Sequence, residues 1–208
     1  MTSPRVSIVT TVYDRVDCLQ QCLRSVQRLQ FRDVEHLVVS DAPSPEVVTQ
    51  IAALCATFGA QHLNLSARHN DWGHTPASVG LRASVGAYVC FLSDDNAYLP
   101  NHFAPLVAAL DDDPDLGFVY SSCLYAGRRE LRYSPPVGAG IDLGQPLFRR
   151  SVLRDCLGDQ IPCRGVFSWD WELIRILMYD HGVRWQHVDE ATFVFRVAAY
   201  PHVVEALA

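Results

Sequence analysis

Two adjacent carboxylates, Asp94 and Asp95, are the side chains of this sequence best suited to chemistry. They follow an apolar run, Ala87 to Leu92, that has the length and composition of a buried strand. Open α/β sheets bind ligands where such strands end. Neighbouring carboxylates repel each other when ionised, and a divalent cation that prefers oxygen ligands, Mg²⁺ or Mn²⁺, removes that cost. The pair therefore indicates a metal site that also grips phosphate oxygens, and the simpler alternative is a polar loop of solvated acids.

Three further positions fall at expected strand ends or helix starts: Tyr13, Asp41 and Asp170. The carboxyl ends of adjacent parallel strands meet at one edge of a sheet, about 5 Å apart. We therefore expect Tyr13, Asp41 and Asp95 to converge on one crevice. Taken singly, each has a structural alternative, such as an Asp41 that only caps the turn before Pro43.

Strand and helix patterns alternate through the first half of the chain. The expected strands are Val6 to Val12, Val34 to Ser40, Gln61 to Leu65 and Ala87 to Leu92. Helices are expected after a cap at Asp14, between Ser44-Pro45 and Gly59, and from Thr75-Pro76 to near Gly86. This rhythm is typical of an α/β fold with a mostly parallel sheet flanked by helices.

The second half has a different, mixed pattern. Helical spacing appears at Phe103 to Leu110, Val152 to Leu157 and Asp170 to Tyr179. Strands are expected at Gly117 to Ala126 and Glu130 to Ser134, as a hairpin around Gly127-Arg128, and at Val183 to Val188 and Thr192 to Val197. Ser134 to Gly144 is rich in Pro and Gly and is expected as a loop. We predict a single domain, 1–208, with a nucleotide-binding half (1–100) and an acceptor and catalytic-base half (101–208).

Composition limits the classes of partner. The chain has 208 residues, of which 49% are hydrophobic and 19% charged, with a net charge of −6. An acidic chain of this kind has no electrostatic footprint for nucleic acid or anionic lipid. Seven scattered cysteines predict reduced thiols and a cytoplasmic location. We see neither a signal peptide nor a transmembrane segment in the sequence.

Three segments together resemble family 2 glycosyltransferases with the GT-A fold, whose sheet is Rossmann-like. They are Val6 to Arg15 with Leu19, Leu23, Ser25 and Val26; Val38 to Ser44; and Gly80 to Asn96. The run Asp94 to Pro100 is especially similar to the spore-coat polysaccharide glycosyltransferase type. The similarity is good over residues 5 to 110 and looser over 140 to 190.

The resemblance implies an inverting transfer from a nucleotide-sugar, most often UDP-linked, to a glycan, lipid-linked or protein acceptor. It places Thr11 and Tyr13 in the base pocket, with Tyr13 stacked on uracil, and Asp41 on the ring N–H of uracil. Asp94 would contact the ribose or the metal shell, and Asp95 would bind the metal, Mn²⁺ or Mg²⁺. The likeness to the spore-coat type implies polysaccharide biosynthesis.

The resemblance also implies a catalytic base at the start of a late helix, where Asp170 matches best. The flanking indoles of Trp169 and Trp171 would raise a carboxyl pKa and can stack on sugar faces. Glu172 is the second candidate. The alternative is that Asp170 only caps its helix and the tryptophans are core.

Other side chains have weaker claims on the ligand. The loop from His69 to Pro76 could approach the diphosphate, with His74 just before a helix N-terminus. Arg149 and Arg150 could meet phosphate, although adjacent arginines are more often solvated. His187 or His202 could complete a metal shell, although a lone histidine is more often structural.

Departures from the family pattern leave two other functions open. Pro76-Ala77-Ser78 stands where the family usually has Ala-Arg-Asn, and Tyr13-Asp14 where it has Tyr-Asn. The Pro76-Ala77-Ser78 segment slightly favours a non-catalytic nucleotide-sugar-binding subunit. A sugar nucleotidyltransferase is disfavoured, because it would need a Gly-rich loop after the first strand, and Thr11 to Arg15 contains no glycine.

Overall fold

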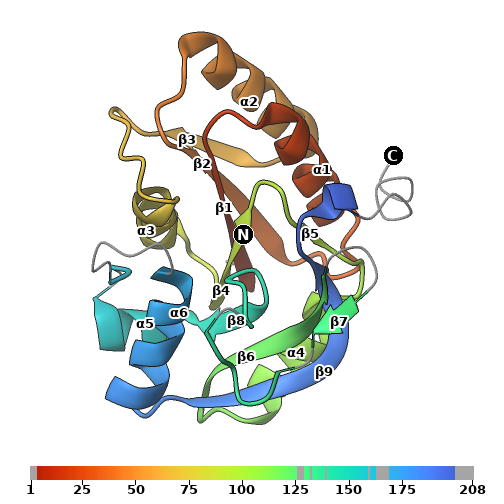
Figure 1. Cartoon of the computed structure of the whole chain (residues 1–208), viewed down its shortest axis with the longest axis vertical. Coiled ribbons are helices and arrows are strands. Elements are labelled where there is room, and N and C mark those ends of the chain that lie inside the picture. The colour runs from red at the N-terminus through yellow and green to blue at the C-terminus, as the bar shows by residue number, and fades with distance from the viewer. Residues whose placement is uncertain are drawn as a thin grey trace.

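The computed structural model describes residues 4–125, 129–131, 133–138, 140–158, 160–162 and 169–199. In these residues nine strands form one mixed sheet, in the order β3-β2-β1-β4-β8-β6-β9-β5, with β7 paired to β6 (Figure 1). The strands are β1 (Val6–Val12), β2 (Val34–Ser40), β3 (Gln61–Asn64), β4 (Tyr88–Ser93), β5 (Ala97–Tyr98), β6 (Leu116–Tyr125), β7 (Arg129–Leu131), β8 (Pro146–Arg149) and β9 (Arg184–Val194).

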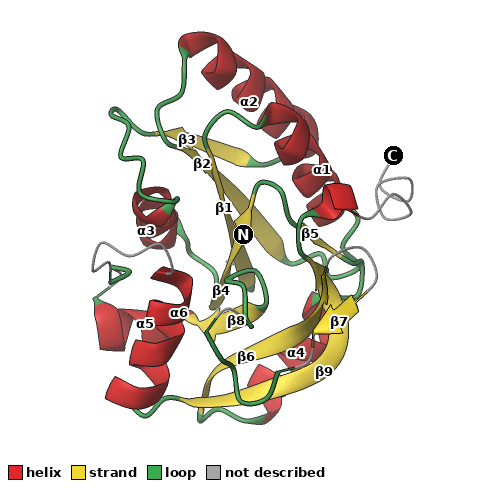
Figure 2. Cartoon of the chain, viewed as in Figure 1, coloured by secondary structure: helices red, strands yellow, loops and turns green. Residues whose placement is uncertain are grey.

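Helices cover both faces of this sheet (Figure 2). They are α1 (Val16–Gln27), α2 (Pro45–Phe58), α3 (His74–Ala83), α4 (Phe103–Asp112), α5 (Arg150–Leu157) and α6 (Trp169–Arg175), which continues into a π-helical turn (Ile176–Asp180). Successive side chains of β1 point to opposite faces of the sheet and pack against the helices on those faces. Ile8 packs in a cluster with α1 and α4, whereas Val9 packs with α3, α5 and α6. None of the described helices is both long and apolar enough to cross a membrane.

The first half of the sheet is parallel, as its alternating strands and helices predict. β1 lies between β2 and β4 and pairs in parallel with both, and β3 extends the sheet beyond β2. The register aligns Val12 with Ser40 and Thr11 with Ser93. The carboxyl ends of β1, β2 and β4 therefore meet at one edge, and the residues that follow them share one rim.

The second half of the sheet differs from its prediction. The two strands expected at Val183–Val188 and Thr192–Val197 are one strand, β9, whose pairing with β6 shifts register at bulges. β5 and β8, of two and four residues, were not predicted, because segments so short carry no readable hydrophobic period. β8 pairs antiparallel with β4 and β6 and so joins the two halves. The hairpin is confirmed as β6 and β7, with its turn, 126–128, outside the described residues.

Helix ends follow the sequence only where a local cap forms. The hydroxyl of Ser44 accepts a backbone N–H at 3.5 Å at the start of α2, and Gly59 ends this helix with a φ of 70°. Asp14 was predicted to cap α1, and that prediction is wrong. Arg15 occupies the N-cap position and makes no side-chain capping hydrogen bond, because a guanidinium has only donors and cannot accept a backbone N–H.

Gly80 allows α3 to pack closely against the sheet. A Cβ at this position would lie 2.3 Å from Cγ1 of Val9 and 3.3 Å from Cγ2 of Val39. Alanine in place of glycine normally stabilises a helix by about 0.5–1 kcal/mol, but overpacking a core costs typically about 1–3 kcal/mol. We therefore expect Gly80→Ala to lower the free energy of unfolding by about 1–2 kcal/mol in urea denaturation. A variant more stable than the wild type would contradict this packing.

Candidate active site

A cleft of about 1030 Å³ lies at the carboxyl edge of the parallel strands. The six residues with the strongest sequence claims to a role all line it: Thr11, Tyr13, Asp41, Asp94, Asp95 and Asp170. Arginine and aromatic side chains form much of the remaining wall, namely Arg15, Arg68, Trp72, Tyr125, Trp169, Trp171, Phe195 and Arg196. The structure thus brings together the residues that were predicted to converge.

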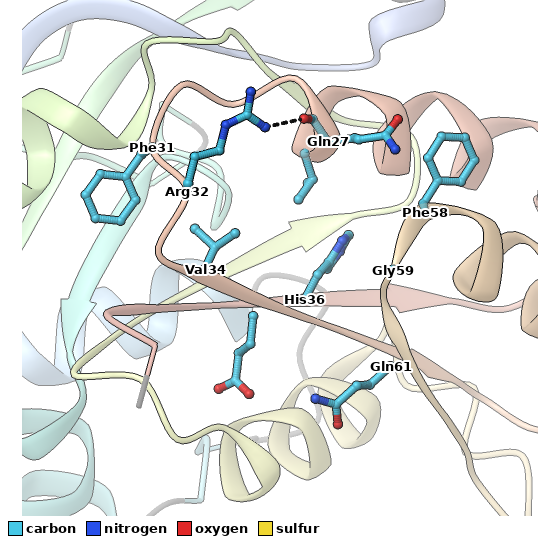
Figure 3. Close-up of a pocket in the computed structure, with 10 residues that line it drawn as sticks. Gln27, Phe31, Arg32, Val34, His36, Phe58, Gly59 and Gln61 are labelled. Carbon is cyan, nitrogen blue, oxygen red and sulfur yellow. Dashed lines mark hydrogen bonds between the residues drawn. The ribbon is translucent and has the colours of Figure 1, made fainter. Parts of the chain in front are cut away.

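A smaller hollow, of about 350 Å³, lies at the amino ends of β2 and β3 (Figure 3). It is bordered by Arg32, His36 and Phe58, and Arg32 is held by the carbonyl oxygen of Gln27 at 3.0 Å. His36 lies 2.8 Å from the hydroxyl of Thr10, and burial lowers its pKa to about 4, so it is neutral. Since α/β sheets bind ligands at the carboxyl ends of their strands, the larger cleft is the candidate active site.

The guanidinium of Arg15 bridges the acid pair. Its Nη1 lies 2.6 Å from Oδ2 of Asp95, its Nε lies 3.2 Å from Oδ2 of Asp94, and its Nη2 contacts Oδ1 of Asp94. The Asp94 side chain is 3% exposed, Asp95 22% and Arg15 52%. Burial raises the pKa of Asp94 to about 7, opposed by the charge of Arg15 and reinforced by that of Asp95. Asp94 therefore titrates near neutral pH even beside Arg15, and additional positive charge at this corner would favour its ionised form.

The same corner fits a divalent cation. Arg15 acts as a stand-in ion, since it shows that positive charge is accepted between Asp94 and Asp95. Carboxylate oxygens are the donors that Mg²⁺ and Mn²⁺ prefer. Within the described ranges no group of three or more His, Cys, Asp or Glu side chains could hold a metal. The chain would supply one or two carboxylates, and phosphate and water oxygens would complete the shell, as is usual for Mg²⁺ at phosphate sites.

Thr11 lies at the end of β1, and Tyr13 lies in the turn after it. The guanidinium carbon of Arg68 lies 3.9 Å from the centroid of the Tyr13 ring, a cation–π contact. A base that stacks on Tyr13 must therefore use the opposite face of the ring or displace Arg68. Thr11 packs against Gly73, where a Cβ would lie 2.9 Å from Oγ1 of Thr11 and where φ is 81°. Glycine is thus required where the loop before α3 passes the end of β1.

Asp41 holds the loop that follows β3. Its carboxylate oxygens accept the backbone N–H groups of His69 at 2.9 Å and of Asn70 at 2.8 Å. This role was not predicted, because nothing in the sequence pairs Asp41 with a loop 28 residues away. Nδ1 of His69 also lies 3.3 Å from Oδ1, so Oδ2, which has a second lone pair, is the oxygen that can also accept a hydrogen bond from a ligand.

Asp170 is the second residue of α6 and lines the cleft. Its Oδ1 accepts the backbone N–H of Trp171 at 2.7 Å, and burial raises its pKa above the ordinary value. Trp169 is buried, and its indole N–H donates to the carbonyl oxygen of Trp72 at 3.1 Å, which ties α6 to the loop before α3. Both indoles line the cleft, but Trp169 is also part of the buried core, as the structural alternative held, whereas Trp171 is only partly buried.

The structure adds a carboxyl that the sequence did not predict. Asp142, in the loop between β7 and β8, lines the cleft, and burial raises its pKa to about 7, with the charges of Asp170 and Asp95 adding to the rise. Its Oδ1 accepts the N–H of Gly144 at 2.8 Å and lies 3.4 Å from Nδ2 of Asn96. In the sequence Asp142 is only an acidic residue within a stretch rich in Pro and Gly, and such a stretch predicts a solvent-exposed loop.

Three basic side chains that could have met phosphate are used elsewhere. Nε2 of His74 lies 2.7 Å from the carbonyl oxygen of Ile161. Arg149 donates to the carbonyl oxygen of Leu110 at 2.8 Å, and Arg150 to a serine hydroxyl at the end of α3 at 3.2 Å. None of the three lines the cleft that the described residues form, so each has a structural role.

The remaining candidates are separated from the acid pair or not described. His187 lies in β9, 2.9 Å from the hydroxyl of Ser122, and does not border the described cleft. His202 lies outside the described residues. Glu172 is held by Arg175 at 2.9 and 3.0 Å and does not border the described cleft either, which leaves Asp170 as the better candidate for a base.

A sheet of this topology, with an acid pair at the carboxyl end of β4, defines the GT-A class of fold. The model of the family described as glycosyl transferase family 2 matches residues 7–164. The chain belongs to this family.

Curated relatives are distant in sequence and longer than the matched segment. An uncharacterized glycosyltransferase of Rickettsia prowazekii is 26% identical over 143 residues, which make up 64% of this chain and 43% of the relative. The GalNAc(5)-diNAcBac-PP-undecaprenol beta-1,3-glucosyltransferase of Campylobacter jejuni is 22% identical over 152 residues, 72% of this chain and 48% of the relative. The chain thus spans less than half the length of these relatives.

Solved structures confirm the predicted fold. S. aureus TarS (residues 1–349), determined in complex with UDP, superposes with a TM-score of 0.73 at 16% identity, over 98% of this chain and 64% of that one. The mannosyltransferase PcManGT from Pyrobaculum calidifontis, determined with GDP-Man and Mn²⁺, gives a TM-score of 0.74 at 19% identity, over 95% and 58% of the two chains. At these identities the likeness establishes the fold alone.

Proposed function

We propose that this chain is a metal-dependent, inverting glycosyltransferase that moves a sugar from a nucleotide-sugar, expected to be UDP-linked, to an acceptor hydroxyl. The observation that carries the proposal is the convergence of Tyr13, Asp41, the acid pair and Asp170 on one cleft. The family supports the reaction class. The UDP bound to TarS, and the GDP-Man and Mn²⁺ bound to PcManGT, support a nucleotide-sugar donor and a divalent cation.

The first half of the chain binds the nucleotide in this proposal. Tyr13 offers a ring for stacking with the base, a contact worth about 1–3 kcal/mol, and Thr11 lies beside it at the end of β1. Asp41 accepts the ring N–H of uracil while it fixes the loop at His69 and Asn70. The uracil would therefore be bound by groups that the fold has already positioned, which lowers the entropic cost of ordering these groups on binding.

Both halves supply the chemistry. Asp170 accepts the proton of the acceptor hydroxyl as the hydroxyl oxygen attacks the anomeric carbon on the face opposite the leaving diphosphate, which inverts that centre. A cation held by Asp94 and Asp95 would neutralise the charge that builds on the diphosphate as the sugar leaves. Trp171 provides an apolar wall beside Asp170, against which an acceptor glycan, lipid-linked or protein-linked, would lie.

Ligand-induced stabilisation tests the donor. We expect UDP with Mn²⁺ to raise the melting temperature by several degrees, because ligand at a hundredfold excess over its Kd stabilises the fold by about 2.7 kcal/mol. GDP with Mn²⁺ is the matched comparison, and UDP with EDTA should give a much smaller rise. An unchanged melting temperature with both nucleotides at millimolar Mn²⁺ would count against a nucleotide-sugar site, whereas binding without UDP release from UDP-sugars and any acceptor would favour a non-catalytic subunit.

A further inference from the structure

Arg15 occupies the place between the two carboxylates that a divalent cation would need. Three guanidinium hydrogen bonds go to Asp94 and Asp95. We propose that Arg15 is a tethered counter-ion, which must leave the acid pair before a divalent cation binds and which then pairs with the diphosphate of the nucleotide. This inference rests on the proposed function and adds a coupling between its ligands: the cation and the nucleotide bind together, and each binds weakly alone.

The geometry allows this exchange because one partner is fixed and the other is not. Asp94 is almost fully buried at the end of β4, whereas the Arg15 side chain is about half exposed. Arg15 lies at the N-cap position of α1, where its side chain makes no capping hydrogen bond. Movement of the guanidinium therefore breaks its contacts with the acid pair and leaves the start of the helix in place.

Charge explains why the two cations exclude each other. A divalent cation binds carboxylate oxygens at about 2.0–2.6 Å, which would bring it into contact with a guanidinium that already bridges both carboxylates. Asp94 and Asp95 balance two positive charges, so Arg15 and a divalent cation together would leave an excess of one. A nucleotide diphosphate removes the excess, and the planar guanidinium fork suits its phosphate oxygens. Cation and nucleotide binding are therefore positively coupled, and the coupling is reciprocal.

Removal of the guanidinium tests this inference directly. Mn²⁺ is titrated without nucleotide, and electron paramagnetic resonance measures the free Mn²⁺. We expect the affinity of Arg15→Gln for Mn²⁺ to be at least about tenfold higher than that of the wild type. UDP should tighten Mn²⁺ binding by a smaller factor in the variant than in the wild type. Arg15→Lys retains a point charge without the bidentate fork and should lie between the two. Arg32→Gln, far from the acid pair, should match the wild type.

The outcomes separate this inference from the function on which it rests. If Arg15→Gln and the wild type bind Mn²⁺ alone equally while UDP and Mn²⁺ bind together in both, the counter-ion role is wrong and the proposed function stands. If neither protein binds Mn²⁺ with or without UDP, both are wrong. Should Arg15→Gln fail to fold, as circular dichroism would show, Arg15→Lys carries the test, with tighter Mn²⁺ binding than the wild type expected and equal binding contradicting the role.

Discussion

Asp170→Asn is expected to slow sugar transfer by about 10²–10⁴-fold, the range that general base catalysis contributes, and to leave UDP–Mn²⁺ binding unchanged. The amide cannot take the proton of the acceptor hydroxyl, so transfer slows. Nucleotide binding is unaffected because Asp170 lies in the opposite half of the chain from the residues proposed to bind uracil. UDP release at saturating donor measures the first effect and calorimetry the second. Glu172→Gln is the matched control, because this carboxylate pairs with Arg175 and does not border the described cleft. Transfer by Asp170→Asn at the wild-type rate would reject Asp170 as the base.

The raised pKa of Asp170 gives the same variant a second, independent readout. Because burial raises this pKa in the folded chain, ionisation of the carboxyl lowers the free energy of unfolding. This loss of stability is fully present above the folded pKa and absent below the unfolded pKa of about 3.9. Asp170→Asn should therefore melt higher than the wild type at pH 7, with the difference vanishing near pH 4. For the same reason the acid limb of the transfer rate should lie above the pKa of an ordinary aspartate. A variant that melts lower at pH 7 would contradict the burial assigned to this group.

Asp95→Asn is expected to remove the stabilisation that UDP and Mn²⁺ give together, and to slow transfer by about 10²–10³-fold, the usual cost of losing one electrostatic stabiliser of a leaving group. An amide oxygen is a weaker ligand than a carboxylate, and the variant also frees one arm of Arg15. Thermal shift over an Mn²⁺ series, with UDP constant, measures the loss of affinity.

The control for this prediction is Asp14→Asn. Asp14 carries the same negative charge as Asp95 and lies next to Arg15 in the sequence. It is exposed, however, and does not border the described cleft. We expect Asp14→Asn to respond to Mn²⁺ and UDP as the wild type does. If Asp95→Asn also kept the full response, the metal would have to bind elsewhere, and the role of the acid pair would be refuted.

The half of the site on the parallel strands was predictable because local signals and geometry agree there. Apolar β-branched runs mark β1, β2 and β4, and parallel pairing with matched register brings their ends to one edge. A polar residue directly after each strand must then lie on a shared rim. The predicted convergence of Tyr13, Asp41 and Asp95 needed only those facts, and for this reason it could be made without any long-range contact.

The parts that were not predicted depend on contacts between distant segments. Asn96 was given no role from the sequence, yet its Oδ1 accepts the N–H of Arg196 at 2.8 Å and its Nδ2 lies 3.4 Å from Asp142. Arg15 lies 79 residues from Asp94, and only the pairing of β1 with β4 places the two together. Residues in such bridges carry no periodicity, so composition and spacing give no sign of them.

Manganese anomalous scattering from crystals grown with UDP and Mn²⁺ tests the central claim most directly. We expect one strong anomalous peak within coordination distance of a carboxylate oxygen of Asp95 and of the UDP phosphates, with the guanidinium of Arg15 no longer between Asp94 and Asp95. UDP seated beside Tyr13 with Arg15 still bridging both carboxylates, and no manganese at that corner, would contradict the account.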